Sequence, residues 1–105
     1  MSIEESSVEK ACEWMVENAS KAAQARAQRE YLSEYRKALK AQIMQEHADL
    51  PIGAQEREAY ADARYTELLG ALKGAVEADE RMRWLLTAAE TKISAWQTQC
   101  RMQRT

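Results

Sequence analysis

The residue types that most often carry out chemistry are few and scattered in this chain. His47 is the only histidine, and the two cysteines, Cys12 and Cys100, lie far from it and from each other in the sequence. A zinc site needs three or four such ligands close together, and a Cys–His catalytic pair needs its two groups within hydrogen-bonding distance. The spacing therefore predicts no metal site, no cofactor site and no catalytic residue.

Acidic residues and glycines give no stronger signal of catalysis. Neighbouring acids such as Glu4 and Glu5 lie in polar, helix-forming sequence, where paired carboxylates are usually solvated rather than tuned for acid–base work. The three glycines form no glycine-rich loop that could hold a phosphate. The cysteines lack the CxxC spacing of redox and zinc motifs, so we expect reduced thiols that are buried as small apolar residues. The protein is therefore predicted not to be an enzyme.

One cluster of basic residues is a candidate for binding a charged ligand. On a helix, five cations between residues 21 and 40 fall on or beside one face, and these are Arg26, Arg29, Arg36, Lys37 and Lys40. Such a face can follow the phosphates of single-stranded nucleic acid, with Tyr31 and Tyr35 available for base stacking. Residues 45–80 are rich in acids, however, and the alternative is that the two stretches neutralise each other. We favour the alternative.

The sequence predicts long helices as the elements that position these side chains. In the second half of the chain, apolar residues recur at alternating steps of three and four, which keeps one stripe facing a partner along the whole helix. The stripe consists of Tyr65, Leu68, Leu72, Ala75, Asp79, Met82, Leu86, Ala89, Ile93, Trp96 and Cys100. Asp79 is its one charged member. It either fixes the register of the packing or pairs with Arg83 on its own helix.

The first half of the chain predicts a second long helix. Ser2 with Glu5, and Ser6 with Glu9, both have the spacing of a capping box at a helix start. The apolar stripe of this helix is expected to run mainly in steps of four. Its members are Val8, Cys12, Met15, Ala19, Ala23, Ala27, Tyr31, Tyr35, Leu39 and Ile43.

A break between the two halves turns the chain back on itself. Pro51 lacks an amide hydrogen and disfavours helical geometry at Leu50, and Gly53 is expected to cap the next helix. A connection this short makes the two helices antiparallel. The sequence therefore predicts an all-α fold. It is a single helical-hairpin domain over residues 1–105, with a helix over about 3–48, a loop at 49–53 and a helix over about 54–102.

Two helices cannot cover all the apolar side chains of this sequence, because Leu69, Val76, Trp84 and Leu85 flank the stripe of the second helix. The simplest expectation is a homodimer in which two hairpins form an elongated four-helix bundle or coiled coil. The alternative is that a different protein covers these residues. The predicted interface consists of Leu72, Val76, Met82, Leu86, Ile93 and Trp96.

Overall composition limits the partners and the location. The formal net charge is −2, so there is no bulk attraction to nucleic acid or to an anionic membrane. Apolar residues make up 46% and charged residues 30% of the chain, which is typical of a folded amphipathic protein. No apolar run approaches the roughly 20 residues of a membrane span, and no secretory signal is evident. We expect a cytoplasmic protein that does not contact a membrane.

Three segments carry a resemblance to known proteins. They are Asp49-Leu50-Pro51-Ile52-Gly53, Ala59-Tyr60-Ala61-Asp62-Ala63-Arg64-Tyr65, and Ala95-Trp96-Gln97-Thr98-Gln99 with arginines behind it. Together with an alanine-rich and charge-rich first helix, they make the chain similar to small uncharacterised helical proteins of tailed bacteriophages and prophages. The resemblance implies a bacterial host cell, an accessory role in phage DNA metabolism or host takeover, and a host or phage protein as partner.

Two functional hypotheses follow. The first is a non-enzymatic adaptor or inhibitor that acts by protein–protein contacts, and it follows from the uncovered apolar residues and the missing chemistry. The second is an accessory factor in phage DNA metabolism or recombination that contacts single-stranded nucleic acid through the basic face. We favour the first.

Overall fold

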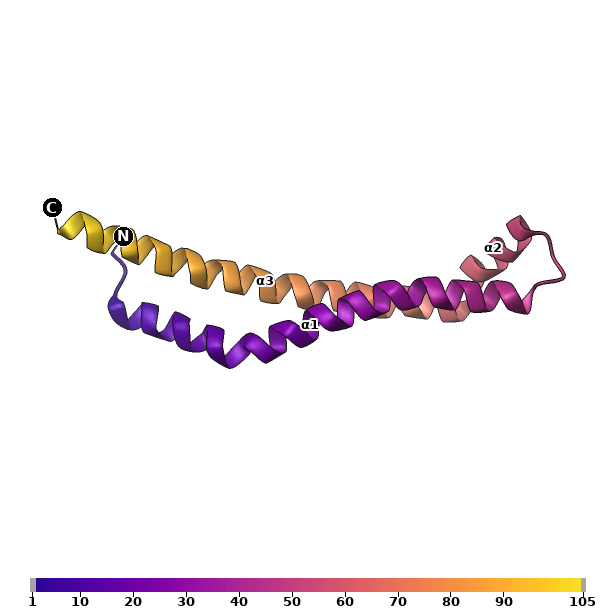
Figure 1. Ribbon diagram of the computed structural model, residues 1–105, viewed down its shortest axis with the longest axis horizontal. Helices are drawn as coiled ribbons and strands as arrows, with labels where there is room; N and C mark the ends of the chain where they lie inside the picture. Colours follow the sequence, from indigo (N-terminus) through magenta and orange to yellow (C-terminus); the bar gives the residue numbers. More distant parts are fainter. Residues whose placement is uncertain (1, 105) are drawn as a thin grey trace.

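The computed structural model describes residues 2–104 and consists almost entirely of three helices, as the sequence predicts for an all-α fold. They are α1 (Glu5–Glu46), α2 (Ile52–Ala61) and α3 (Ala63–Gln103). α1 and α3 run antiparallel, so the two chain ends lie at the same end of the molecule (Figure 1). The molecule is very elongated, with principal extents of 76 × 23 × 15 Å.

The prediction of one continuous helix over about residues 54–102 was wrong, because the helix is interrupted at Asp62. This residue has an extended backbone (φ −71°, ψ 135°), and its carboxylate accepts a hydrogen bond from the backbone N–H of Arg64 at 2.8 Å. It is therefore the N-cap of α3, a position that aspartate favours. The break allows α2 to pack against the C-terminal part of α1. In this contact Ala59 is fully buried, and Lys40 Nζ lies 4.7 Å from the ring centre of Tyr60.

The turn between α1 and α2 also differs from the prediction. α1 ends at Glu46 and α2 begins at Ile52, so Gly53 lies inside the first turn and does not cap the helix. Pro51 occupies the cap position with a φ of −58°, and its carbonyl accepts a hydrogen bond from the backbone N–H of Gln55 at 2.9 Å. A proline fits there because its missing N–H would have no partner within the helix.

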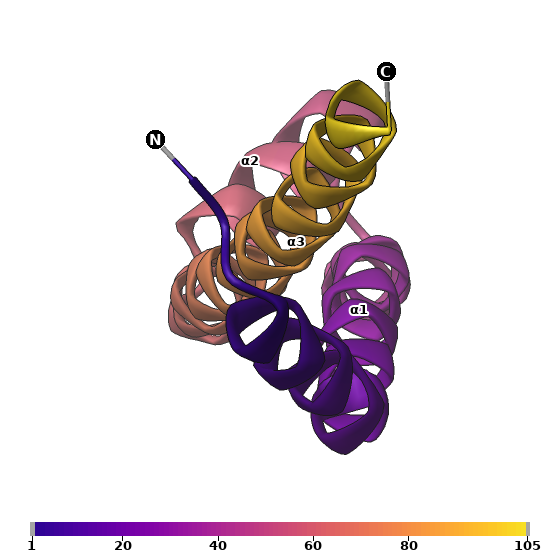
Figure 2. The same cartoon turned by 90° about the vertical axis from the view of Figure 1, so that its left-hand side faces the viewer.

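Neither predicted capping box forms at the start of α1. Glu4 precedes the helix and makes no side-chain cap. Instead, the Gln99 side chain of α3 binds the residues before α1. Its Oε1 accepts from the Ile3 N–H at 2.9 Å and from Ser2 Oγ at 3.4 Å, and its Nε2 donates to the Ile3 carbonyl at 2.9 Å. Residues 2–4, which we call the N-terminal strap, are thus hydrogen-bonded to the end of α3 and cross from there to the start of α1 (Figure 2).

The stripe predicted for α3 is confirmed, because each of its eleven positions, from Tyr65 to Cys100, is buried or half-buried. The stripe predicted for α1 was partly wrong, since Ala19, Ala23 and Ala27 are exposed. The side of α1 that is buried or half-buried follows steps of three and four instead. Its members are Val8, Ala11, Met15, Asn18, Ala22, Ala25, Arg29, Leu32, Arg36, Leu39 and Ile43. Polar residues at positions 18, 29 and 36 hide this pattern in the sequence.

The core is concentrated in the half of the molecule next to the turn. Its buried cluster consists of Leu32, Leu39, Ile43, Ala59, Tyr65, Leu68 and Ala75. In the half that holds the chain ends, the buried apolar residues among those described are Val8, Ala11 and Ala89. Figure 1 shows that α1 bows away from α3 in this half. The hairpin is therefore well packed at one end and thinly packed at the other.

Replacing Ile43 by alanine tests this account of the core. Its side chain has 0% exposure, so we expect Ile43→Ala to lower the free energy of unfolding by about 2–4 kcal/mol. Val16 is 80% exposed, and Val16→Ala should change the free energy by less than about 0.5 kcal/mol. Urea denaturation followed by circular dichroism measures both. Similar losses in the two variants would contradict the placement of the core.

Candidate partner-binding surface

A cluster of charged residues lies in the middle of the packed faces of α1 and α3. Asp79 is only 5% exposed, and its Oδ2 lies 3.1 Å from Nη1 of Arg29 on α1. The same guanidinium lies 2.8 Å from Oε1 of Glu80, which is also 3.1 Å from Nη1 of Arg83. Hydrogen bonds to Glu80 and Asp79 raise the pKa of Arg29, and the bond from Arg29 lowers the pKa of Glu80.

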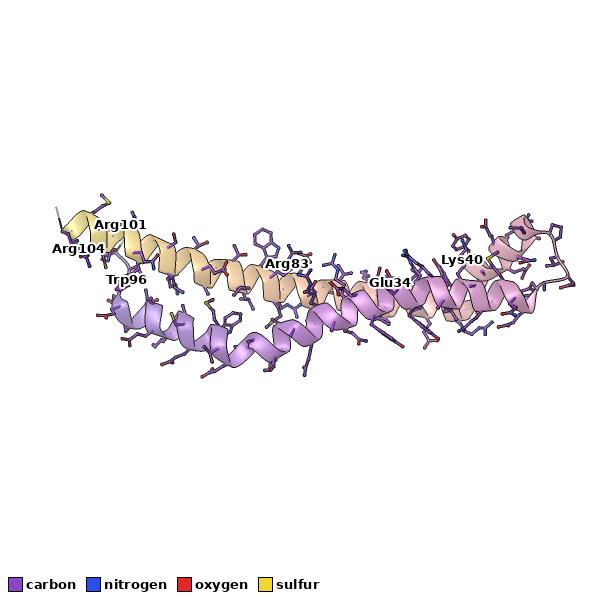
Figure 3. All side chains as sticks on the ribbon, viewed as in Figure 1. Glu34, Lys40, Arg83, Trp96, Arg101 and Arg104 are labelled. Atoms are coloured by element: carbon purple, nitrogen blue, oxygen red, sulfur yellow. The ribbon has the colours of Figure 1, made fainter. Side chains whose placement is uncertain are left out.

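This cluster connects the two helices across their interface. Of the two alternatives for Asp79, the structure has the aspartate paired across the helix interface with Arg29. Arg83, which is labelled on α3 in Figure 3, pairs with Glu80 instead.

Sliding α1 along α3 by one heptad brings either Ala22 or Arg36 level with Asp79. With Ala22 there, Asp79 would be buried without a cation, which is costly. Asp79 therefore disfavours a shift of the register in that direction.

The five predicted nucleic-acid contacts do not form one open basic face. Arg29 and Arg36 lie in the buried side of α1, and Arg36 is half-buried. Of the other three, Arg26 and Lys37 are exposed and Lys40 is half-buried, and each pairs with an acid. These ion pairs are Arg26–Glu30 at 3.1 Å, Lys37–Glu34 at 3.4 Å and Lys40–Glu56 at 3.6 Å. Four of the five cations are thus neutralised by acids of the same chain, and contact with nucleic acid stays a prediction.

The predicted interface residues lie mainly between α3 and α1. Leu72, Met82, Leu86, Ile93 and Trp96 are stripe residues of α3, and Leu72 packs against the core cluster. Val76 lies next to the stripe. All six are half-buried rather than buried, and those from Met82 to Trp96 lie where α1 is thinly packed against α3. Their contact with a second chain stays a prediction.

An uncovered apolar surface lies elsewhere on α3, around Trp84, which is 71% exposed. A groove of about 840 Å³ lies between α3 and the N-terminal segment of the chain. The residues of α3 that line it are spaced at steps of four, three and four. Its other wall comes from the strap and the first turns of α1. Residues that line it include Ile3, Ser7, Trp84, Ala88, Thr91 and Ala95.

A second, smaller hollow of about 290 Å³ adjoins this groove and shares Ser7 and Ala88 with it. It brings Trp14 of α1 next to Leu85 of α3, which is 46% exposed. Trp84 and Leu85 are recognisable from the sequence as residues outside the stripe. Ile3 is not, because the Gln99 contact that places it joins residues 96 positions apart.

The thiols and the histidine are dispersed. Cys12 and Cys100 are free, and Cys12 is exposed, which contradicts the expectation of a buried thiol. His47 is half-buried at the end of α1. Among residues 2–104, no three His, Cys, Asp or Glu side chains are grouped so that they could hold a metal ion.

A second charged cluster joins the three helices near the turn. The Arg64 guanidinium binds Glu46 of α1 at 2.8 and 3.0 Å and Asp62 at 2.9 and 3.0 Å. These hydrogen bonds raise the pKa of Arg64 and lower the pKa of Glu46. Hydrogen bonds from the side chain and then the backbone of Arg64 lower the pKa of Asp62 from 3.8 to about 2.

Comparison with known proteins identifies no relative: no family model, curated protein or solved structure matches this chain. Within the described part of the chain, no helix is both long enough and apolar enough to cross a lipid bilayer.

A double-mutant cycle tests the role of the Arg29–Asp79 pair. Arg29→Met should destabilise the fold because it leaves Asp79 buried without its cation, and Arg29→Met with Asp79→Leu should recover most of that loss. Chemical denaturation of the single and double variants gives the coupling energy. The exposed Arg26–Glu30 pair, measured in the same way, should show a clearly smaller coupling. Equal coupling energies would show that the buried pair stabilises the fold no more than an exposed ion pair does.

An acid titration tests the ion-pair cluster of Arg64 with Asp62 and Glu46. Its pKa is lower in the folded chain than its ordinary value, so its contribution to stability is fully present above pH 3.8 and is lost as the pH falls toward 2. NMR titration of the Asp62 carboxyl should give a pKa near 2. Arg64→Met should return the pKa toward its ordinary value, whereas Arg57→Met, on the exposed side of α2, should leave it unchanged. An ordinary pKa of Asp62 in the unmodified protein would contradict the ion pair between Asp62 and Arg64.

Proposed function

We propose that this protein is a non-enzymatic helical interaction protein that acts as an adaptor or inhibitor through contacts with other protein chains. The observation that carries the proposal is the apolar groove beside Trp84, an indole that is 71% exposed. Large exposed aromatic residues in an apolar groove are typical of binding surfaces, because their burial contributes strongly to association.

The uneven packing of the hairpin supports the same proposal. Met82, Leu86 and Ile93 are only half-buried although they point toward α1. A further chain that packed against this half would remove more of their apolar surface from water. Each Å² of apolar surface buried in this way contributes about 25 cal/mol. The chain-end half therefore gains most from a partner.

A second copy of the chain is the simplest partner, because two-fold self-association is the commonest way to cover an apolar face. Two hairpins would then form an elongated four-helix assembly. The resemblance to small helical proteins of tailed phages favours a host or phage protein as a further partner of that assembly.

Contact with single-stranded nucleic acid is the less favoured alternative. The ion pairs of Arg29 and Lys40 with acids of α3 and α2 argue against it. A phosphate backbone would have to compete with carboxylates that are already in place. This competition would weaken the salt-dependent attraction that such binding needs.

Light scattering on the purified chain separates the two functions. One chain has a mass of 12.0 kDa, and we expect about twice that mass at micromolar concentration, unchanged by a single-stranded oligonucleotide at low or physiological salt. A mass that rises with oligonucleotide and falls back with salt would favour the nucleic-acid function. A chain that stays monomeric in every condition would contradict the proposed self-association.

A further inference from the structure

The side of α3 opposite to its packed stripe carries a second regular pattern. Residues at steps of four and three share one face of a helix. On this side they are Gly70, Gly74, Glu77, Arg81, Trp84 and Ala88, and all six are exposed. We call this set the outer face of α3. It meets the groove at Trp84 and Ala88.

The two glycines of the outer face have no role within one chain. Neither has a positive φ, and a Cβ added at either position would meet no atom within 4 Å. A glycine inside a helix lowers helix stability relative to alanine. Their advantage is that they let another helix, or a large side chain of another helix, come close to the backbone of α3.

Two opposite charges lie between the glycines and the tryptophan. Arg81 Nη2 is 3.2 Å from Oε1 of Glu77, and the side chains are 66% and 68% exposed. Among residues 2–104, no charge of a neighbouring helix forms an ion pair with either of them. The outer face therefore presents a small region, an acid, a base and a large apolar residue, in that order along the helix.

This order is self-complementary. Consider a second α3 placed antiparallel to the first by a two-fold axis level with residue 79. Glu77 of one helix then lies opposite Arg81 of the other, and Gly74 lies opposite Trp84. Gly70 then meets Ala88. Every large or charged residue thus meets a small or oppositely charged one on an identical helix, which is the condition for an isologous contact.

We propose that the outer face of α3 binds α3 of a second copy of this chain, antiparallel about a two-fold axis level with Asp79. Trp84 of each copy packs over Gly74 of the other, and Glu77 of each copy forms an ion pair with Arg81 of the other. The proposal rests on the proposed function as an interaction protein and identifies one of its partners and the surface that binds it.

The flanking residues on one edge of the outer face fit the same arrangement. Leu85, which is 46% exposed, comes beside Ala71 of the second copy, and Ala78 comes beside its own counterpart. These positions add apolar contacts along one edge of the pair. The overlapping part of α3, from about residue 63 to 95, is roughly 48 Å long at 1.5 Å per residue. In the resulting dimer, the two α3 helices lie together and the two α1 helices lie outside them.

Charge reversal on the full-length chain tests the pairing. Glu77→Arg places arginine opposite arginine in a pair of identical copies, and Arg81→Glu places acid opposite acid. We expect each variant alone to raise the dimer dissociation constant about tenfold or more, measured by analytical ultracentrifugation, because two attractive contacts become repulsive. An equimolar mixture of the two variants restores both ion pairs, so it should form heterodimers with an affinity close to that of the unmodified chain.

The matched control is Glu30→Arg, which reverses one charge of the Arg26–Glu30 pair on α1. That pair has the same spacing as Glu77–Arg81 and nearly the same exposure, 71% and 66%. The control should leave the dissociation constant unchanged. Circular dichroism of each variant establishes that the helices remain folded, so that a weaker dimer is not the result of unfolding.

The outcomes separate this inference from the proposed function. A dimer whose dissociation constant is unaffected by both reversals overturns the α3 pairing, while self-association of the chain stands. Weakening by each reversal without rescue in the mixture also overturns the pairing, because the two residues then do not face each other. A chain that is monomeric before any substitution overturns both.

Discussion

A pair of antiparallel helices can bury only one stripe of each helix, and this limit explains most of what the molecule presents to solvent. Ile43 is the only side chain among those described that is fully buried and large. Trp84 and Leu85 lie outside the stripe and stay exposed. A hairpin of this length therefore has a stable core along one line and keeps apolar residues on its other sides, where a further helix can reach them.

Charges do much of the positioning within that limit. Apolar stripes alone can slide past each other by a heptad with little change in contacts, but a buried carboxylate cannot leave its cation without a large desolvation cost. Arg29 and Asp79 hold the middle of the hairpin in this way. Near the turn, Arg64 binds Glu46 and Asp62 and holds α2, α3 and the end of α1 together.

The same ion pairs bear on function. A basic stretch read from sequence alone looks available to a phosphate backbone, whereas in the folded chain most of its cations have acids beside them. Charges that remain without a partner from another helix, such as those of Glu77 and Arg81, lie on the outer face of α3. The exposed apolar groove adjoins that face. Both features favour a helix of another chain over nucleic acid as the ligand.

Much of the fold follows from local sequence patterns. The heptad spacing from Tyr65 to Cys100 predicted the packed side of α3, because the period of apolar residues reports directly which face of a helix is buried. Pro51 marked the turn, since a proline cannot continue a helix without losing a hydrogen bond. The packed side of α1 was harder to recognise, because Arg29 and Asn18 occupy positions where apolar residues are expected.

The tertiary structure alone determined the contacts that join residues far apart in the chain. Asp62 interrupts the second helix because its carboxylate accepts hydrogen bonds from Arg64. The Arg64 guanidinium also binds Glu46, a residue that comes near it only after the chain has turned. For the same reason, Asp79 pairs with Arg29 rather than with Arg83, and Gln99 binds Ser2 and Ile3 where the sequence predicted a capping box at Ser2. Periodicity is a local property that sequence carries, whereas the choice among several charged or polar partners depends on which of them the folded chain brings within hydrogen-bonding distance.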